Sequence, residues 1–534
     1  MRLLPRKVLP SRILIDEVKN EIFQEQSKEL YELRQELSTL RPLQENHING
    51  LAKLLIKVWL APGNKKQEKL FFDDPVWGHT CIDEELSDLF FHPLIQRLNH
   101  IKQLSFAYLR FPNATHSRLA HSLGTCRNLE ASLTTIFRNN LLYKATGTEN
   151  ISLDPVARRQ LIIKAKAAAL LHDVGHAPFG HALDKFIGYY DPLRPLPHPD
   201  KHYSREYLDK FLKHHLPGSI DSDNLGAILH PDRVGLSTWD TLAADLLDSA
   251  LDADRMDFLV RDAHMTGLSM GVTGIEALIE RMCPFQDEDQ IFLTFHSSCL
   301  PYVEDFLMAR EKMYALCYEN PSKLAAERIF TRLVENLLRE HKLDIDTVML
   351  LTDEQILALL GLAAVTSEES SKLLYALLQN IEFVSVFEAD LTESTDSGNE
   401  KTPPLPSRNA QISQWTSSRS SRRMGRWAYI DAPNEWERTI AIAGGLGEKN
   451  KCQVLVTVPD QRTSVPNEIS ALILERTASG YRVRKLFDFD PKLKDRLTDA
   501  HKPRGKIRVF ADSRLNADQK SDIQRAAHEL LGAH

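Results

Sequence analysis

Three histidines and two aspartates lie within thirteen consecutive positions of the chain, from His172 to Asp184. Imidazoles and carboxylates at this density suit a divalent metal ion, and a further histidine can transfer a proton. A single His–Asp pair carries little weight, because 20 histidines and 73 acidic residues in 534 produce such pairs by chance. The prediction of a metal site therefore depends on matching groups elsewhere in the chain.

Two predicted helices position this stretch. Residues 155–171 form the first, which becomes more apolar toward its C-terminal end, where Gly175 can stop it. Pro178 suits the first turn of the second helix. On that helix His181 and Asp184 stand at i, i+3, so the carboxylate can hydrogen-bond the imidazole and fix its tautomer. His172 and Asp173 would adjoin the helix end, where both side chains can turn toward one ion.

A third predicted helix, after residues 111–116, supplies another imidazole. Thr115 or Ser117 can cap it, and Arg118 and His121 then lie one above the other on one face. A guanidinium beside a neutral imidazole suits a metal–phosphate site. Taken alone, however, this segment is more typical of a solvated helix start.

Residues 246–262 are predicted to form one helix that is unusually acidic for its apolar frame. The carboxylates at positions 248, 252 and 254 are too many for a core face unless they meet cations or a metal. Asp257 and Arg261 also fit a simple i, i+4 ion pair. Another predicted helix, Val303 to Tyr318, aligns Arg310, Tyr314 and Tyr318 on one stripe, a pattern more often found at a core edge.

Three separate segments thus supply two imidazoles and two carboxylates to one divalent ion: His121, His172, Asp173 and Asp254. Such a ligand set leaves coordination positions for water and for a phosphate oxygen. The sequence does not choose between Mn, Mg, Fe and Zn.

The order of these residues resembles the HD-domain phosphohydrolases, and more closely their dGTPase-like branch of deoxynucleoside triphosphate triphosphohydrolases, which includes the SAM-and-HD-domain enzyme. The resemblance covers roughly residues 69–390 and, more weakly, the C-terminal part; we recognise no SAM domain. It rests on residues 101–104, 111–116, 118–124, 172–181, 252–258 with 261–262, and 380–383.

The resemblance implies a role for each matching residue. His121, His172, Asp173 and Asp254 would hold the metal. His176, His181, Asp184 and His202 would form the catalytic group, with His181 as general acid and Asp184 orienting it. Tyr203 stands where the family usually has Glu, with Glu206 one turn on. The substrate-binding residues would be Arg118, Arg255 and Arg310 for the triphosphate, Gln103 and Asp262 for the sugar 3′-hydroxyl, and Tyr318 against the 2′ position.

Composition places the chain among ordinary proteins with sizeable cores, since 43% of its residues are hydrophobic and 26% charged. The net charge of −7 gives no general attraction to nucleic acid or membrane. Six scattered cysteines without a CxxC pair, no signal-peptide pattern and no apolar run of membrane-spanning length suggest a cytoplasmic protein. The longest apolar run, Ile356 to Val365, is predicted to be a core helix started by Thr352-Asp353-Glu354.

We expect a mainly α protein with four parts. Residues 1–66 form a helical extension, and residues 67–390 an all-helical HD-domain core. Residues 391–428 form a linker or mobile loop, and residues 429–534 a small α+β lobe with strands near 454–458, 481–487 and 506–511 and a final helix near 516–531. The basic cluster 419–426 fits polyanion binding less well than a solvated, flexible segment.

The predicted function is metal-dependent hydrolysis of a dNTP to deoxynucleoside and triphosphate, by a homo-oligomer. Two alternatives stay open: an HD phosphohydrolase acting on another nucleotide or on single-stranded nucleic acid, and a sensor that binds nucleotide or nucleic acid without turnover.

Overall fold

The computed structural model describes residues 45–61, 68–190, 196, 198–230, 235–269, 274–341, 343–365, 367–390, 431–458, 471–501 and 506–531. Within these ranges the chain is mainly helical, which confirms the predicted fold class. Most of the expected N-terminal extension, the expected linker and the basic cluster 419–426 lie outside the described residues; α2 (Glu45–Leu55) is the described helix of the extension.

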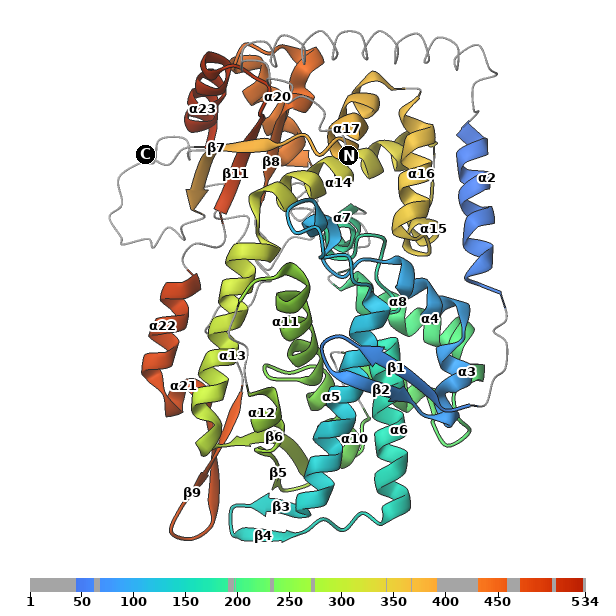
Figure 1. The fold of residues 1–534 in the computed structure, drawn as a ribbon, viewed down its shortest axis with the longest axis vertical. Helices are drawn as coiled ribbons and strands as arrows, with labels where there is room; N and C mark the ends of the chain where they lie inside the picture. The colour runs from blue at the N-terminus through green and yellow to red at the C-terminus, as the bar shows by residue number, and fades with distance from the viewer. Residues whose placement is uncertain are drawn as a thin grey trace, which may run out of the picture.

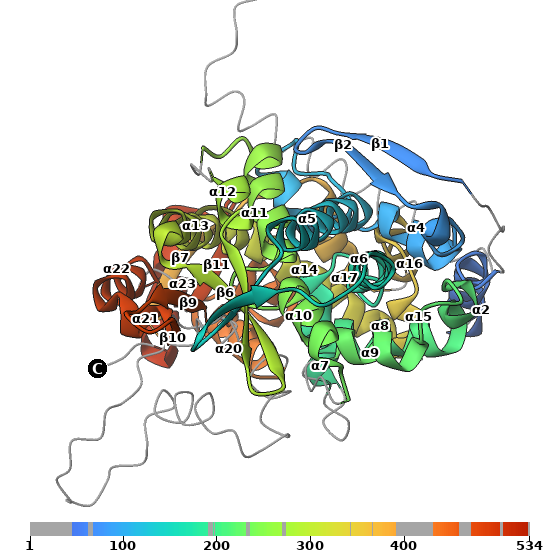
Figure 2. The ribbon, with the colours of Figure 1, turned by 90° about the horizontal axis from the view of Figure 1, so that it is seen from below.

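Four helices that pack together position the His–Asp stretch (Figures 1 and 2). Helix α5 (Arg118–Asn139) packs against α6 (Pro155–Leu171) and α11 (Ala253–Thr266), and α10 (Thr238–Leu247) packs on α6. A side chain caps each of these N-termini: Ser117 accepts from Ala120 N, Asp154 from Val156 N, Ser237 from Asp240 N, and Asp252 from Arg255 N. Helix α6 has the predicted bounds.

Further helices surround this centre. The first group begins after the His–Asp stretch: α7 (His181–Tyr190), α8 (Pro199–Tyr207) and α9 (Ser222–Leu229). The second group is α12 (Ile275–Ile279), α13 (Leu300–Met313), α14 (Pro321–His341), α15 (Ile345–Met349), α16 (Asp353–Ala364) and α17 (Glu368–Leu378). Thr352 caps α16 in a capping box with Gln355, as predicted. Two short helices, α3 (Ser87–Phe90) and α4 (Pro93–Arg97), precede α5.

Residues 67–390 are not wholly helical, which corrects the prediction of an all-helical core. Strands β1 (Leu70–Asp74) and β2 (Gly78–Ile82) form a hairpin. A six-stranded sheet has the order β10-β9-β6-β5-β3-β4. It includes two further hairpins, β3 (Leu141–Lys144) with β4 (Gly147–Asn150) and β5 (Met282–Asp287) with β6 (Gln290–His296). Strands this short are hard to tell from loops by periodicity alone, and the pairing of β3 with β5 joins segments that are distant in sequence.

The C-terminal region contributes to two sheets. Strands β9 (Leu472–Arg476) and β10 (Tyr481–Lys485) extend the six-stranded sheet, and β9 runs parallel to β6. At the other end of the molecule, β7 (Phe383–Asp390), β11 (Lys506–Asp512) and β8 (Val454–Thr457) form an antiparallel sheet with α20 (Ala432–Ala443) and α23 (Ala517–Leu531) (Figure 1). Helices α21 (Leu486–Phe489) and α22 (Pro491–His501) lie beside α13.

Three predicted helices have different bounds. The chain breaks between α10 and α11, because the Asp252 carboxylate caps α11 and also accepts from Ser249 N. Helix α7 begins at His181, since residues 178–180 form a turn. The helix predicted from Val303 begins at Leu300 and changes to a π-helical turn over Tyr314–Tyr318. No helix among the described residues is long and apolar enough to cross a membrane.

Candidate metal centre

The predicted metal ligands come together at the N-terminal ends of α5 and α11 and the C-terminal end of α6. His121 Nε2 lies 3.3 Å from His172 Nε2 and 2.9 Å from Asp254 Oδ1. His172 Nε2 lies 3.4 Å from Asp173 Oδ1 and 3.8 Å from Asp254 Oδ1. All four predicted ligands therefore converge on one point.

The hydrogen bonds behind the two rings determine what that point can bind. His121 Nδ1 donates to Asp257 Oδ2 at 2.7 Å, and His172 Nδ1 donates to the Ala169 carbonyl at 2.7 Å. In the neutral rings both Nε2 atoms are then acceptors, and they face each other between two carboxylates. Only a cation or added protons can satisfy such a group of acceptors, so the residues fit a divalent metal ion.

The charges around His121 show how strongly the site favours a cation. Burial alone would lower the pKa of His121, but hydrogen bonds and charges from Asp254 and Asp257 raise it to about 10. Burial would raise the pKa of Asp173, but His172, Arg118 and His176 hold it well below its usual range. A bound metal ion would displace protons from these groups.

Asp257 is a functional residue that the sequence analysis treated only as an ion-pair partner. Its carboxylate accepts from His121, from both Nε and Nη2 of Arg261, and from the indole of Trp77 at 2.5 Å. It packs against Gly124 of α5, where a Cβ would lie 1.7 Å from Asp257 Oδ1. Asp257 thus fixes the tautomer and orientation of His121. Its position three residues after Asp254 was the available signal.

Arg97 holds the turn that follows His172, and sequence analysis missed it too. The guanidinium is fully buried and donates to the carbonyls of Val174 at 3.3 Å and His176 at 2.8 Å, and to those of Met349, Leu350 and Leu351. Ser204 of α8 also stabilises this turn. Its hydroxyl donates to the His172 carbonyl and accepts from Gly175 N. Gly175 is needed because a Cβ there would lie 2.1 Å from the Asp200 carbonyl.

The second predicted group, His176, His181 and Asp184, lies beside the metal ligands. His176 Nε2 is 3.1 Å from Asp173 Oδ1, and its Nδ1 is 2.5 Å from Asp184 Oδ2. Asp184 was predicted to orient His181, but it makes its hydrogen bond with His176, and His181 Nδ1 lies 3.6 Å away. The His181 side chain is 69% exposed, whereas its two partners are buried. His181 is therefore the member of this group that can reach an incoming ligand.

Arg118 links the two groups and has spare hydrogen-bonding capacity. Its Nη1 donates to Asp173 Oδ2 at 2.8 Å, and the side chain is 1% exposed. Among the described residues, neither Nε nor Nη2 has a hydrogen-bond partner. A buried guanidinium with two unused donors is suited to receive an anion.

Gln103, Asp262 and Tyr318 gather as predicted, together with His116. Asp262 accepts from Tyr318 OH at 2.7 Å, and its other oxygen lies 2.8 Å from His116 Nε2. Gln103 N donates to the His116 carbonyl. Within the part of the chain that the structure describes, Gln103 Oε1 and His116 Nδ1 are buried without a hydrogen-bond partner. These polar atoms can recognise a hydroxyl-bearing ligand.

The remaining predicted residues are placed differently. Arg255 donates to the Ser249 carbonyl and to the Asp252 carboxylate. Arg310 is buried on α13, with its guanidinium over the Tyr314 ring. His202 is half exposed on α8, with Nε2 3.5 Å from the Glu206 carboxylate. Burial would lower the pKa of Arg255, but the charges of Asp252, of the proposed ligand Asp254 and of Asp248 raise it, so Arg255 belongs to the electrostatic surroundings of the metal ligands.

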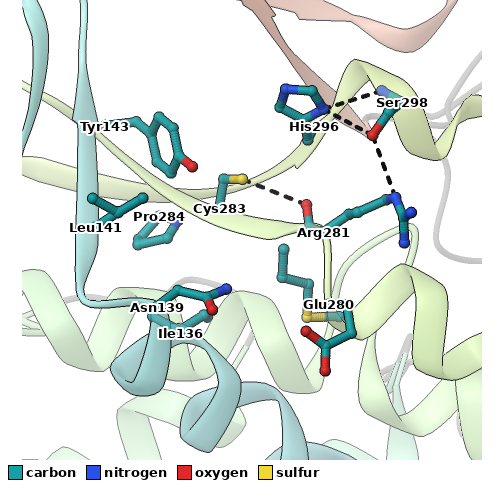
Figure 3. Close-up of a pocket in the computed structure, with 11 residues that line it drawn as sticks. Ile136, Asn139, Leu141, Tyr143, Glu280, Arg281, Cys283, Pro284, His296 and Ser298 are labelled. Carbon is teal, nitrogen blue, oxygen red and sulfur yellow. Dashed lines mark hydrogen bonds between the residues drawn. The ribbon is translucent and has the colours of Figure 1, made fainter.

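The described cavities lie away from this cluster. One, of about 120 Å³, is lined by residues of α5, β3, β5 and β6, including Ile136, Tyr143, Cys283 and His296 (Figure 3). Ile136 is fifteen residues beyond His121 on α5, which is about 22 Å at 1.5 Å per residue. A second, of about 240 Å³, lies between α14 and α17. Neither is lined by a predicted site residue.

Comparison with known proteins gives relatives of this fold and site. No protein-family profile matches the chain. The chain is 31% identical over 284 residues to the uncharacterised protein YwfO of Bacillus subtilis, covering 52% of this chain and 58% of that one. It is 26% identical over 279 residues to an HD domain-containing protein, L394, of Acanthamoeba polyphaga mimivirus, covering 50% and 58%. Fold, site and relatives support the HD-domain phosphohydrolase superfamily.

Two further proteins are similar to this chain. A phosphohydrolase from Bacteroides thetaiotaomicron has the same fold, with a TM-score of 0.57 at 20% identity over 84% of this chain and all of that one. The deoxynucleoside triphosphate triphosphohydrolase SAMHD1 homolog of Dictyostelium discoideum is 27% identical over 212 residues, 39% of this chain and 38% of that one. The chain spans little more than half the length of the first curated relatives it matches.

Proposed function

We propose that this protein is a metal-dependent phosphohydrolase and that its substrate is a deoxynucleoside triphosphate, which it cleaves to deoxynucleoside and triphosphate. One observation carries the proposal: two imidazole Nε2 acceptors face each other at 3.3 Å between two carboxylates, beside a buried guanidinium with two unpartnered nitrogens. The two imidazoles and two carboxylates favour a divalent cation, and the guanidinium favours an anion.

The metal would be held by His121, His172, Asp173 and Asp254. When bound, such an ion lowers the pKa of its water ligand toward 7 and polarises a phosphoryl oxygen. Arg118, fixed by Asp173, would stabilise charge that develops on the phosphoryl oxygens.

His181 is proposed to donate the proton that the leaving 5′ oxygen requires. Burial and the positive charges of His176 and Arg118 lower the pKa of His181 to about 3 in the free protein, so the negative charge of the bound phosphate must hold that proton on His181. His181 is the exposed member of its group, and it stands edge-on to the His176 ring with the centroids 5.0 Å apart. Burial and Arg118 would lower the pKa of His176, but Asp184 and Asp173 raise it to about 9. The His176 ring therefore keeps its proton between the two carboxylates, and it contributes a positive charge to the site.

The preference for a deoxynucleoside triphosphate is the finer part of the proposal. It is supported by the partial likeness to the Dictyostelium discoideum homolog and by the polar group around Asp262, which can bind a sugar hydroxyl. The Tyr318 hydroxyl donates a hydrogen bond to Asp262, which fixes the orientation of the Tyr318 ring. The ring would then limit the space beside the sugar.

Product analysis tests both parts. Purified protein is incubated separately with four dNTPs and four NTPs in Mn²⁺, Mg²⁺, Fe²⁺ or Zn²⁺, and the products are separated by ion-exchange chromatography. The proposal requires inorganic triphosphate in equal amount to a deoxynucleoside. Release of orthophosphate or pyrophosphate, or hydrolysis only of another phosphoester, would instead favour the broader alternative of an HD phosphohydrolase on a different nucleotide or nucleic acid.

A further inference from the structure

The carboxylate of Asp353 bridges two loops beside the proposed active site. Asp353 is the first residue of α16 and is fully buried. Its Oδ1 accepts from Phe179 N at 2.6 Å, and its Oδ2 accepts from Lys102 N at 3.0 Å. The Lys102 ammonium lies 3.5 Å from the same Oδ2. One side chain therefore joins segments that are far apart in the sequence.

Phe179 is the middle residue of the 178–180 turn that leads into α7. Phe179 and Gly180 both have left-handed backbone angles, with φ of +56° and +49°. A non-glycine residue rarely adopts this conformation, and it needs surrounding support. Phe179 gains support from the Asp353 hydrogen bond and from stacking on Phe106, with ring centroids 4.1 Å apart.

This turn presses against Arg118. A Cβ on Gly180 would lie 2.3 Å from Arg118 Nη2, so the backbone itself closes over the guanidinium. The Gly180 carbonyl accepts from Leu183 N and Asp184 N, which sets the first turn of α7 and therefore the direction of His181. The turn thus defines the spacing between Arg118 and His181.

Lys102 belongs to the segment on the other side of Arg118. It forms an isolated bridge with Ser117, and Arg118 N donates to the Ile101 carbonyl at 2.9 Å. Asp353 consequently holds both backbone segments that flank Arg118.

The buried carboxylate makes stability depend on pH. Burial raises the pKa of Asp353 to about 6, against the lowering effect of Lys102 and of the Phe179 hydrogen bond; Glu354 raises it further. Tyr108 and Arg97 also feel its charge. Because the folded protein binds the proton more tightly than the unfolded chain, stability falls as pH rises from about 4 to 6.

We propose that Asp353 is a positioning residue: by bridging Lys102 N and Phe179 N, it fixes the 179–180 turn over Arg118 and thereby places His181 relative to the phosphoryl group that Arg118 binds. The catalytic part of this inference rests on the proposed function, whereas the structural part does not.

The variant Asp353→Asn tests it, because Asn keeps the volume but offers only one acceptor for two N–H donors. Glu354→Gln is the matched control, since Glu354 also lies 3.5 Å from Lys102 Nζ but accepts no backbone N–H from either loop. Three properties are measured on the full chain. They are the bound metal, the kcat and KM for the nucleotide that the product analysis identifies as substrate, and the hydrogen exchange of the amides of residues 177–184.

Asp353→Asn should keep its metal and its KM while kcat falls roughly 10- to 100-fold, as expected for a misplaced catalytic group. Exchange over 177–184 should become faster. The ratio of wild-type to variant kcat should shrink below about pH 6, where Asp353 itself is protonated. Asp353→Glu, which restores both acceptors, should recover part of the rate, and Glu354→Gln should behave as wild type.

Unchanged kcat and exchange in Asp353→Asn would overturn the inference, as would an equal loss in Glu354→Gln or a loss that follows the metal content. If wild-type protein hydrolyses no nucleotide, the proposed function fails, and the exchange measurement alone still decides whether Asp353 fixes the turn.

Discussion

The indole N–H of Trp77 donates to Asp257 Oδ1 at 2.5 Å, so the turn between β1 and β2 reaches the carboxylate that orients His121. Asp74, the last residue of β1, lies 2.8 Å from Arg261, which is a further partner of Asp257. The β1–β2 hairpin therefore contacts the carboxylate that orients the proposed metal ligand His121.

Removing this support should weaken metal binding without removing a ligand. Asp257→Asn is expected to lower metal affinity roughly 10- to 100-fold, as is typical when the partner of a metal-binding histidine is lost. Trp77→Phe should lower it less, because Arg261 and His121 still hold the carboxylate. Calorimetric titration of metal-stripped protein with Mn²⁺ measures both.

Trp59→Phe is the matched control for the tryptophan. Its indole donates to Gln355 at 3.1 Å, away from Asp257, so its metal affinity should equal that of wild type. Equal losses from both tryptophan substitutions would mean that the hairpin turn has no specific link to the metal.

Substitutions at two other residues should distinguish the loss of metal binding from the loss of proton donation. Asp173→Ala removes a proposed ligand and the partner of Arg118, so bound metal and turnover should both be lost. His181→Ala should retain metal but lose roughly 10²- to 10⁴-fold in kcat, the usual contribution of a general acid. Elemental analysis beside steady-state kinetics measures the two effects. Full metal content in Asp173→Ala would contradict the ligand assignment.

The parts of the site that could be predicted were those with a local signature. Helix α6 followed from a run that becomes more apolar toward its C-terminal end and from Gly175 after it, and the four ligands followed from residue types near helix ends. Asp184 shows the limit of this reasoning. It stands at i, i+3 from His181, yet His176 binds it, because the 178–180 turn brings the two side chains together before the helix begins.

The residues that hold the proposed ligands and their loops in place had no local sequence pattern that identified them. Asp257 with Arg261 is indistinguishable in sequence from a surface ion pair, and Arg97 and Asp353 act on backbone atoms of distant loops. Long-range packing, which no local pattern encodes, determined the positions of these three residues. Strands β5 and β6 are a different case, because they form a hairpin of neighbouring segments whose short strands the sequence analysis did not identify.

Gly124 should be essential for the metal centre, while another helical glycine should not. An Ala Cβ at position 124 would lie 1.7 Å from Asp257 Oδ1, so Gly124→Ala must displace the carboxylate from His121. We expect lower metal affinity and a lower melting temperature. Gly361→Ala on α16 has nothing within 4 Å of the new Cβ and should stabilise the protein by about 0.5–1 kcal/mol. Thermal unfolding and Mn²⁺ titration compare the two, and an unaffected Gly124→Ala would disprove the close packing of α5 on Asp257.

A buried ion cluster between α5, α6 and the segment that follows β2 should make stability depend on acid pH. Lys166 is fully buried, 2.5 Å from Asp83 and 2.6 Å from Glu130, and Arg159 lies 2.8 Å from Asp83. Burial would raise the pKa of Asp83, but Lys166 and Arg159 together lower it below 3.8. Because the folded pKa lies below the unfolded one, the stabilisation is complete above about pH 4 and is lost as pH falls through the folded pKa.

Asp83→Asn should therefore lower the free energy of unfolding by about 3 kcal/mol at pH 7, since it removes one partner of a buried cation. The difference from wild type should shrink as the pH falls below 4. Glu85→Gln, which also contacts Arg159 but is half exposed, should cost less than about 1 kcal/mol. Urea unfolding at pH 7 and at a series of acid pH values measures all three proteins. A difference between Asp83→Asn and wild type that stays constant with pH would show that the carboxylate is not charged in the folded protein.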